Sequence, residues 1–188
     1  MKWWAFLIFH LPYIQQSVRA KDFIEFLQWD NCRASDASGP YRLVNTSFGL
    51  VSPAVSEFNT TFVLGQDFDI VVIKFSIYEC KTMRDSDCEL FLSVNVPDHC
   101  KKMTEKGQFY SIMAEAASPK ITCPFKKGEY RITQARCPIE KVANVPMGEY
   151  IIYKIVWLFE HHGKRVGCWV MKARKSRVRS RKKKGNEN

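Results

Sequence analysis

Two stretches of the chain alternate strictly between apolar and mixed side chains, and this period constrains the fold more than any other feature. From residue 150 to residue 160, every second side chain is apolar or aromatic, whereas the opposite set includes Lys154. From residue 70 to residue 80, Val, Ile and Phe alternate with a set that includes Lys74 and Ser76. Successive side chains of a β-strand point to opposite faces, so this period of two predicts two half-buried strands.

Shorter segments with the composition of strands surround these two. They are residues 23–29, 43–51, 60–64, 89–96, 130–133 and 166–173, the last of which follows the 150–160 strand through a hairpin turn. Residues 98–117 lack the alternation and predict a short helix or a mobile loop. Because Gly, Pro and Asn separate the strands, we expect an all-β protein, an antiparallel two-sheet sandwich or a barrel-like cup.

The first twenty residues have the features of a secretory signal peptide. A charged start at Lys2 precedes an apolar stretch over residues 3–14, and Val18 and Ala20 occupy the −3 and −1 positions of a cleavage site. The stretch is shorter than the about 20 apolar residues that a membrane anchor needs. We therefore expect cleavage after Ala20, a secreted protein that acts extracellularly or in the lysosome, and one domain over residues 21–173.

Cysteines and glycosylation motifs agree with an oxidising compartment. All seven cysteines, at positions 32, 80, 88, 100, 123, 137 and 168, follow the signal peptide, and secreted domains of this size often contain disulfides. The sequons Asn45-Thr46-Ser47 and Asn59-Thr60-Thr61 predict N-glycosylation at Asn45 and Asn59.

The net charge of +10 comes from the ends of the chain. The signal peptide contributes +2 and residues 172–188 contribute +8, so residues 21–171 are neutral overall. The basic residues of this tail are Lys172, Arg174, Lys175, Arg177, Arg179, Arg181, Lys182, Lys183 and Lys184. We expect residues 174–188 to be disordered. The tail could bind anionic membranes or sulfated glycans, or be an inert or protease-trimmed extension. A neutral domain does not indicate a nucleic-acid partner.

Residues suited to catalysis are sparse. The chain has no Gly-x-Ser-x-Gly motif of the kind that positions a lipase nucleophile. Beyond the signal peptide its histidines are His99, His161 and His162, and the adjacent pair lies in the predicted turn. Neighbouring side chains of an extended strand point apart, which disfavours chelation by this pair. We expect no enzymatic activity, no catalytic residue, no cofactor and no metal site, and a secreted lipid hydrolase is the less favoured alternative.

The apolar strand faces have two interpretations. They can meet in a solid sandwich core, or they can line a cavity between sheets that splay apart. A cavity of this kind binds acyl chains with little polar chemistry, because each buried methylene contributes about 0.8 kcal/mol. Composition does not separate the two interpretations.

Four short strings resemble those of the ganglioside activator family, which belongs to the wider lipid-recognition (ML-like) domains. They are WDNC at residues 29–32, CPFKKGEY at 123–130, GEY at 148–150 and GKRVGC at 163–168, in the order of that family and across about residues 23–173. The resemblance implies disulfides Cys32–Cys168, Cys80–Cys88 and Cys100–Cys123. The family's fourth bridge has no counterpart here, and Cys137 is left over: it is free, joins another chain or displaces one of these pairs.

The resemblance also implies a non-enzymatic β-cup with an open apolar cavity. By analogy, the lining would be Phe75, Ile77, Ile151, Tyr153, Ile155, Trp157 and Phe159, with a membrane-contacting rim at residues 101–117 and 137–147. Such a protein extracts a glycosphingolipid, phospholipid or sterol from a membrane and presents it to a glycosidase or a receptor, as in sphingolipid metabolism. A lipid-sensing co-receptor or an extracellular carrier of sterols or fatty acids is the alternative.

Overall fold

The computed structural model describes residues 21–52, 55–105, 111–138, 148 and 151–178. The expected signal peptide lies outside these residues. In the described part of the chain, one sheet has five antiparallel strands in the order β1-β9-β8-β4-β5. Their bounds are Lys21–Asn31 for β1, Lys164–Val178 for β9, Ile152–His161 for β8, Val72–Cys80 for β4 and Cys88–Val96 for β5.

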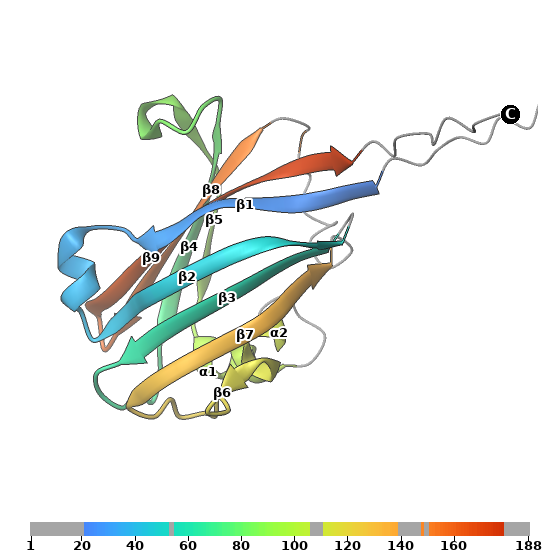
Figure 1. The fold of residues 1–188 in the computed structure, drawn as a ribbon. Coiled ribbons are helices and arrows are strands. Elements are labelled where there is room, and N and C mark those ends of the chain that lie inside the picture. The colour runs from blue at the N-terminus through green and yellow to red at the C-terminus, as the bar shows by residue number, and fades with distance from the viewer. Residues whose placement is uncertain (1–20, 53–54, 106–110, 139–147, 149–150, 179–188) are drawn as a thin grey trace, which may run out of the picture.

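A second antiparallel sheet, in the order β2-β3-β7-β6, forms the other layer (Figure 1). Its strands are β2 (Tyr41–Ser52), β3 (Val55–Leu64), β7 (Gly128–Pro138) and the short β6 (Ala117–Ser118). The helices α1 (His99–Thr104) and α2 (Ser111–Glu115) lie beside β6 and β7, and two 3₁₀ helices, η1 (Ala34–Ser38) and η2 (Asp85–Asp87), occupy loops. The expected all-β, two-sheet antiparallel fold is confirmed.

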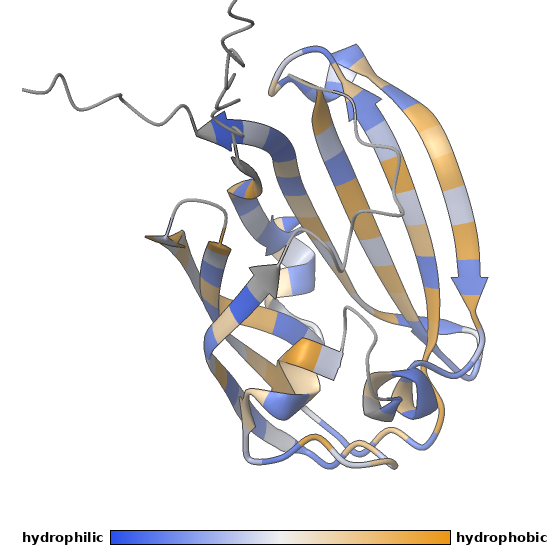
Figure 2. Cartoon of the chain, turned by 90° about the vertical axis from the view of Figure 1, so that its right-hand side faces the viewer, coloured by the Kyte–Doolittle hydropathy of each residue, from blue (hydrophilic) through white to orange (hydrophobic). Residues whose placement is uncertain are grey.

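Alternation along the strands is the reason that two layers form. Figure 2 shows hydrophobic and hydrophilic residues following one another along the strands. Many of the side chains that point between the sheets are aromatic, and several of them pack edge to face. Between ring centroids, Tyr41 lies 5.1 Å from Trp169 and 4.2 Å from Phe159. These contacts join β2 of one sheet to β9 and β8 of the other, so the aromatic residues hold the layers together.

Among the described residues, three disulfides connect the elements of the fold, and they are the pairs that the family resemblance implies. Cys32–Cys168 joins the segment after β1 to β9, Cys80–Cys88 closes the β4–β5 hairpin, and Cys100–Cys123 ties α1 to the segment before β7. The first closes a loop of 136 residues, which on the chain-entropy account contributes about 4–5 kcal/mol. Cys137 lies in β7, where its backbone pairs with that of Ser56.

The disordered tail was expected to begin at residue 174, and the structure corrects that boundary. β9 continues to Val178 because β1 provides a partner for it, with Glu25 opposite Arg174 and Lys21 opposite Val178. Lys172, Arg174, Lys175 and Arg177 therefore belong to β9, whereas residues 179–188 lie outside the described part of the chain.

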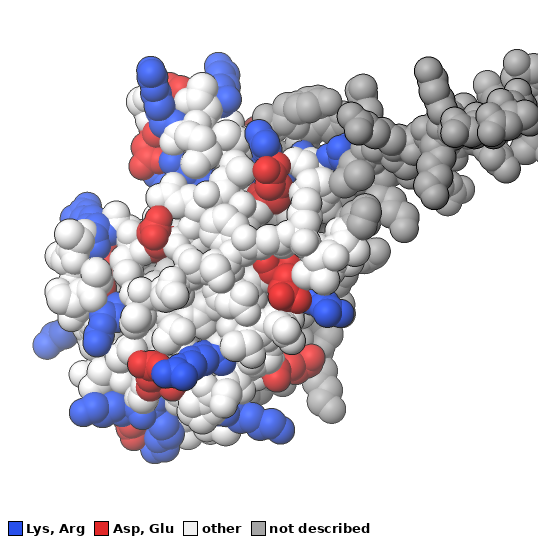
Figure 3. All heavy atoms as spheres, viewed as in Figure 1, with Lys and Arg blue, Asp and Glu red and all other residues white. Residues whose placement is uncertain are grey.

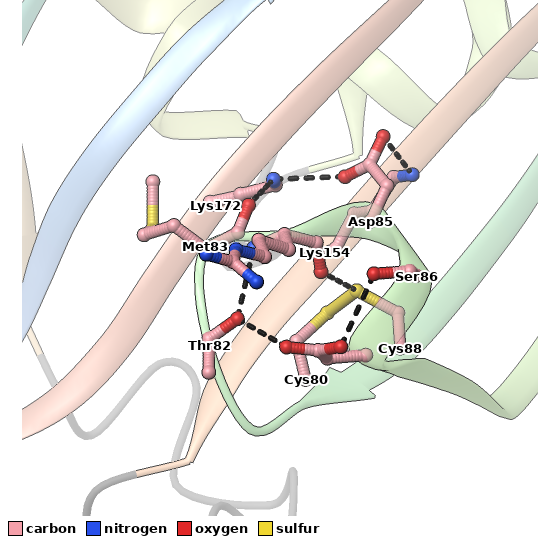
Figure 4. Close-up of a disulfide and its surroundings, with 10 residues drawn as sticks. Cys80, Thr82, Met83, Asp85, Ser86, Cys88, Lys154 and Lys172 are labelled. Carbon is pink, nitrogen blue, oxygen red and sulfur yellow. Dashed lines mark hydrogen bonds and ion pairs between the residues drawn. A yellow bond between two sulfur atoms is a disulfide. The ribbon is translucent and has the colours of Figure 1, made fainter.

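Lys172 in particular is a buried structural residue, not part of a membrane-binding tail. Its ammonium donates to the carbonyl oxygen of Met83 and lies 2.8 Å from Asp85 Oδ1, while Lys154 lies 2.9 Å from Asp85 Oδ2 (Figure 4). Lys154 and Lys172 face each other directly across β8 and β9. Like charges in that position repel, so the carboxylate between them is what fixes the Cys80–Cys88 loop to the sheet.

The structure contains no candidate transmembrane helix: among the described residues, no helix has the length and apolar character needed to span a bilayer.

Candidate binding cavity

The two sheets enclose a cavity of about 450 Å³, which we call the central cavity. Its walls come from every strand of the five-stranded sheet, from β2 and β3 of the other sheet, and from α1 and α2. This volume lies within the range of about 300–1,000 Å³ that is usual for small-molecule sites. Of the two interpretations of the apolar faces, the structure has the hollow one.

Most of the lining expected from the sequence lies in the wall of the central cavity. Phe75, Ile77, Tyr153, Ile155, Trp157 and Phe159 all line it. Ile151 does not. It precedes β8, so the alternation that turns Tyr153 and Ile155 inward does not extend to it, and its side chain lies against Gly148 instead.

The remaining lining residues were not singled out from the sequence, although their strands were expected. They include Ile24, Phe26 and Trp29 of β1, Phe58 and Phe62 of β3, Leu92, Val94 and Val96 of β5, and Trp169, Met171 and Ala173 of β9. The sets follow the period of two with two interruptions: the small Thr60 stands between Phe58 and Phe62 in β3, and a β-bulge between Phe26 and Gln28 turns Trp29 inward in β1. The same alternation that marked β4 and β8 could therefore have found them once every strand was given an inward face.

The mouth of the central cavity lies beside β5 and α1. Leu92 is 44 % exposed, and Val94 and Lys102 are also exposed, although all three line the cavity. Tyr41 and Phe159, which also line the cavity, are buried. Among the described residues, β5 is the edge strand of its sheet, and no further strand pairs with it on this side.

The expected rim over residues 101–117 contributes in part to this mouth. Lys102 and Met103 of α1 and Met113 of α2 line the cavity. Lys102 Nζ lies 2.9 Å from each carboxylate oxygen of Glu105, which holds a charged pair at the opening. Of the second expected rim segment, residues 139–147 lie outside the described residues.

Apart from Lys102 at the mouth, the polar groups in the wall are neutral at physiological pH. His99 is half-buried, packs against Phe125 and Phe159, and has its pKa lowered to about 3 because burial disfavours the imidazolium form. Burial likewise raises the pKa of Tyr41. Among the described residues, neither the Trp29 nor the Trp169 indole N–H has a hydrogen-bond partner. The inner wall thus offers apolar surface with a few neutral polar groups.

The lining has the chemistry of a binding site for apolar groups. No Ser, Thr, Cys, Asp or Glu is among the lining residues in the described part of the chain. A single-chain amphiphile would place its hydrocarbon against the aromatic wall and its polar end at the mouth, where Lys102 and Glu105 are available.

The two glycosylation sequons lie on neighbouring strands of the smaller sheet. Asn45 of β2 is exposed. Asn59 of β3 is half-buried, and its Oδ1 accepts a hydrogen bond from the backbone N–H of Gln134 across 2.8 Å. Asn45 is therefore the more accessible acceptor of the two. On the face that Figure 3 shows, basic and acidic side chains lie intermixed around an uncharged centre.

No known protein family matches the sequence, and no curated protein matches it. Among solved structures, the chain is similar to chicken MD-1 complexed with lipid IVa, with 12 % sequence identity, a TM-score of 0.40, and coverage of 82 % of this chain and 97 % of that one. It is also similar to a Niemann-Pick type C2 protein from the Japanese carpenter ant, at 13 % identity and a TM-score of 0.38 over 79 % and 98 % of the respective chains. At these values neither likeness carries a functional conclusion.

Proposed function

We propose that this protein binds one lipid molecule in the central cavity, extracts it from a membrane and presents it to a partner without chemical change. The observation that carries the proposal is a cavity of about 450 Å³ whose wall is almost wholly apolar and whose mouth is open. With about 0.8 kcal/mol per buried methylene, an acyl segment of about ten carbons would contribute ~8 kcal/mol before the cost of ordering it.

Contact with the membrane would occur at the edge strand beside the mouth. Leu90, Phe91, Leu92 and Val94 of β5 are exposed apolar side chains, and Leu92 and Val94 are also part of the cavity wall. A lipid that leaves the bilayer along this strand keeps its hydrocarbon on apolar surface throughout. Exposed apolar patches of this kind mark sites of membrane or protein contact.

A place in the ganglioside activator family, and hence a glycolipid as cargo, is part of the proposal. It rests on the four sequence strings, two of which meet in space: Cys32 of the first forms a disulfide with Cys168 of the last, and the Cys32 N–H donates to the Cys168 carbonyl oxygen across 3.0 Å. A glycosidase or a receptor would be the partner, and the secretory pathway, ending outside the cell or in the lysosome, the place of action.

Tryptophan fluorescence gives a direct test, because Trp29, Trp157 and Trp169 all line the cavity and are the tryptophans that come after the signal peptide. Vesicles that contain a phospholipid brominated on its acyl chain should quench this fluorescence, and quenching should persist after the vesicles are removed. Native mass spectrometry should then find one lipid per chain. Absence of bound lipid together with unquenched tryptophans would refute the proposal. The identity of lipid that co-purifies from cells distinguishes a glycolipid activator from a sterol or fatty-acid carrier.

A further inference from the structure

The turn between β8 and β9 gathers two imidazole rings on one side of the hairpin. β8 ends at His161 and β9 begins at Lys164, so His162 and Gly163 form a two-residue loop. Both have positive φ, 47° at His162 and 74° at Gly163, as a type I′ turn requires. Because His162 is not extended, the two rings do not diverge as the sequence suggested: their centroids lie 4.1 Å apart.

A carboxylate from a distant segment meets both rings. Asp69 precedes β4, and its Oδ1 lies 2.7 Å from His161 Nε2 and 3.3 Å from His162 Nε2. One ligand atom from each residue lies within 4.8 Å of the other two, a cluster found in the described part of the chain. Two nitrogens and one oxygen thus lie together, outside the central cavity.

Two of these three groups are held in place by their surroundings. The His161 side chain is 16 % exposed and packs edge-on against Phe68, with 5.1 Å between ring centroids. Asp69 Oδ1 also accepts a hydrogen bond from the Ile70 N–H across 2.9 Å. These two hydrogen bonds hold Asp69 Oδ1 beside the imidazole of His161.

The third group, His162, leaves the cluster open to solvent. The side chains of His162 and Asp69 are 67 % and 62 % exposed, so a hydrated ion can approach and keep water at its remaining coordination positions. An ordinary ion pair would need only one imidazole. Two imidazolium rings this close would repel each other, whereas two neutral rings can both donate a nitrogen lone pair to one cation.

We propose that Asp69, His161 and His162 form a binding site for a divalent transition-metal ion, with Zn²⁺ as the best match. Zn²⁺ takes His nitrogen and carboxylate oxygen at about 2.0–2.2 Å in tetrahedral geometry, which places neighbouring donor atoms roughly 3.3 Å apart. The His162–Asp69 distance has this value, and the His161–Asp69 hydrogen bond would open by about 0.6 Å to reach it. Ca²⁺ and Mg²⁺ prefer sites made wholly of oxygen.

The site would fasten the β8–β9 turn to the segment before β4. Val72 of β4 pairs with Glu160 of β8, whereas Cys80 pairs with Ile152. The metal site and the Cys80–Cys88 disulfide therefore lie at opposite ends of these two strands. A bound ion would join the β8–β9 turn to the segment before β4, which none of the three disulfides among the described residues joins directly. This inference is independent of what the central cavity binds.

Titration of the full chain, produced in a secretory host without a polyhistidine tag, tests the site. At neutral pH, calorimetry should show one equivalent of Zn²⁺ bound, and Co²⁺ should give the visible absorption of a low-coordinate nitrogen–oxygen site. His162→Asn should weaken Zn²⁺ binding about tenfold or more, and the fold should survive because His162 is exposed and Asn tolerates positive φ. Asp69→Asn should do the same.

Glu160→Gln is the matched control. Glu160 adjoins His161 in sequence and pairs with Lys74 across 2.7 Å, outside the cluster, so this variant should bind Zn²⁺ as the wild type does. A wild-type chain that takes up no Zn²⁺ saturably, or a His162→Asn chain that binds it with unchanged affinity, would overturn the proposal.

Discussion

Arg174 of β9 and Glu25 of β1 form an ion pair in which Arg174 Nε lies 2.7 Å from Glu25 Oε2. The Ser176 hydroxyl donates to the same oxygen across 2.7 Å. The bond from Arg174, aided by that from Ser176, lowers the pKa of the Glu25 carboxyl. A carboxyl whose pKa is lowered by folding stabilises the fold above its unfolded pKa, and this contribution is lost as the pH falls through the folded value. At neutral pH the pair holds the end of β9 on β1.

Truncation should therefore distinguish the end of β9 from the basic segment beyond it. A chain that ends at Val178 should unfold at the same temperature as the full chain. A chain that ends at Ala173 loses the pairing of residues 174–178 with residues 21–25 and should be destabilised by about 1–2 kcal/mol, which is roughly 3–6 °C in a domain of this size. Scanning calorimetry checks both, and equal melting of the two truncated chains would contradict the role given to the ion pair.

The same truncation at Val178 also tests the basic segment beyond β9. Residues 179–188 carry five basic residues and one acid, and each net charge near an anionic surface contributes about 1 kcal/mol. Removing them should weaken binding to vesicles of anionic phospholipid at low ionic strength by about tenfold or more, and leave lipid occupancy of the central cavity unchanged. Co-sedimentation in about 1 M salt, where charges are screened within ~3 Å, should abolish the difference.

Lipid uptake should depend on whether a substitution in β5 lies on the face that lines the cavity or on the opposite face. Leu92 and Phe91 are each 44 % exposed, but only Leu92 lines the central cavity. Leu92→Asp should lower the affinity for a monomeric fluorescent fatty acid about tenfold or more, because a carboxylate at the mouth would have to be desolvated by the bound chain. Phe91→Asp should leave that affinity unchanged. Equal effects of the two substitutions would show that the mouth lies elsewhere.

Acid should destabilise the fold through His99. The folded pKa of about 3 lies below the ordinary value of 6.5, so between these values the unfolded chain binds a proton that the folded chain does not. Stability therefore falls as the pH decreases, by about 1.4 kcal/mol per unit, or ~2 kcal/mol at pH 5. Urea unfolding at pH 7.5 and pH 5 measures how much the free energy of unfolding falls on acidification. This fall should be smaller by about 2 kcal/mol in His99→Gln than in the wild type. An unchanged loss would place the acid sensitivity in other groups.

Removing the Asp85 carboxylate should lower the free energy of unfolding more than removing a carboxylate whose partner is exposed. Asp85→Asn leaves Lys172, 7 % exposed, facing Lys154 without a negative charge between them, and should lower the free energy of unfolding by about 1–3 kcal/mol. Asp67→Asn is the control, since Asp67 pairs with the exposed Lys126 and such surface pairs contribute little. Similar losses in the two variants, measured by urea unfolding, would contradict the bridging role of Asp85.

The local sequence pattern was sufficient to predict the strands and much of the cavity wall. Phe75 and Trp157 alternate with polar or smaller residues, so a β-strand at these positions turns them inward whatever the order of strands in the sheet. The hollow could not be predicted in the same way, because a solid core and a cavity call for the same inward side chains. What differs is the distance between the sheets beside the edge strand β5 and the helices α1 and α2, and this is a property of the assembled layers.

Residues whose roles depend on distant partners were misjudged for a related reason. Arg174 and Lys172 were assigned to a disordered tail on their charge, but Arg174 pairs with a residue 149 positions earlier and Lys172 donates to one 89 positions earlier. No window along the sequence contains both partners. His162 was misjudged locally, because alternation holds only for extended backbone and its φ is 47°.

The pairing of β1 with β9 sets the moment at which the protein can take up its first ligand. β1 is the first described strand to be synthesised and β9 the last, yet they are neighbours in one sheet and both supply cavity wall, through Trp29 and Trp169 among others. Until β9 leaves the ribosome, β1 has no neighbouring strand in its own sheet, and the backbone edge that pairs with β9 stays unpaired. If the cavity binds lipid as proposed, we expect loading only after β9 has completed the five-stranded sheet, because both β1 and β9 supply its wall.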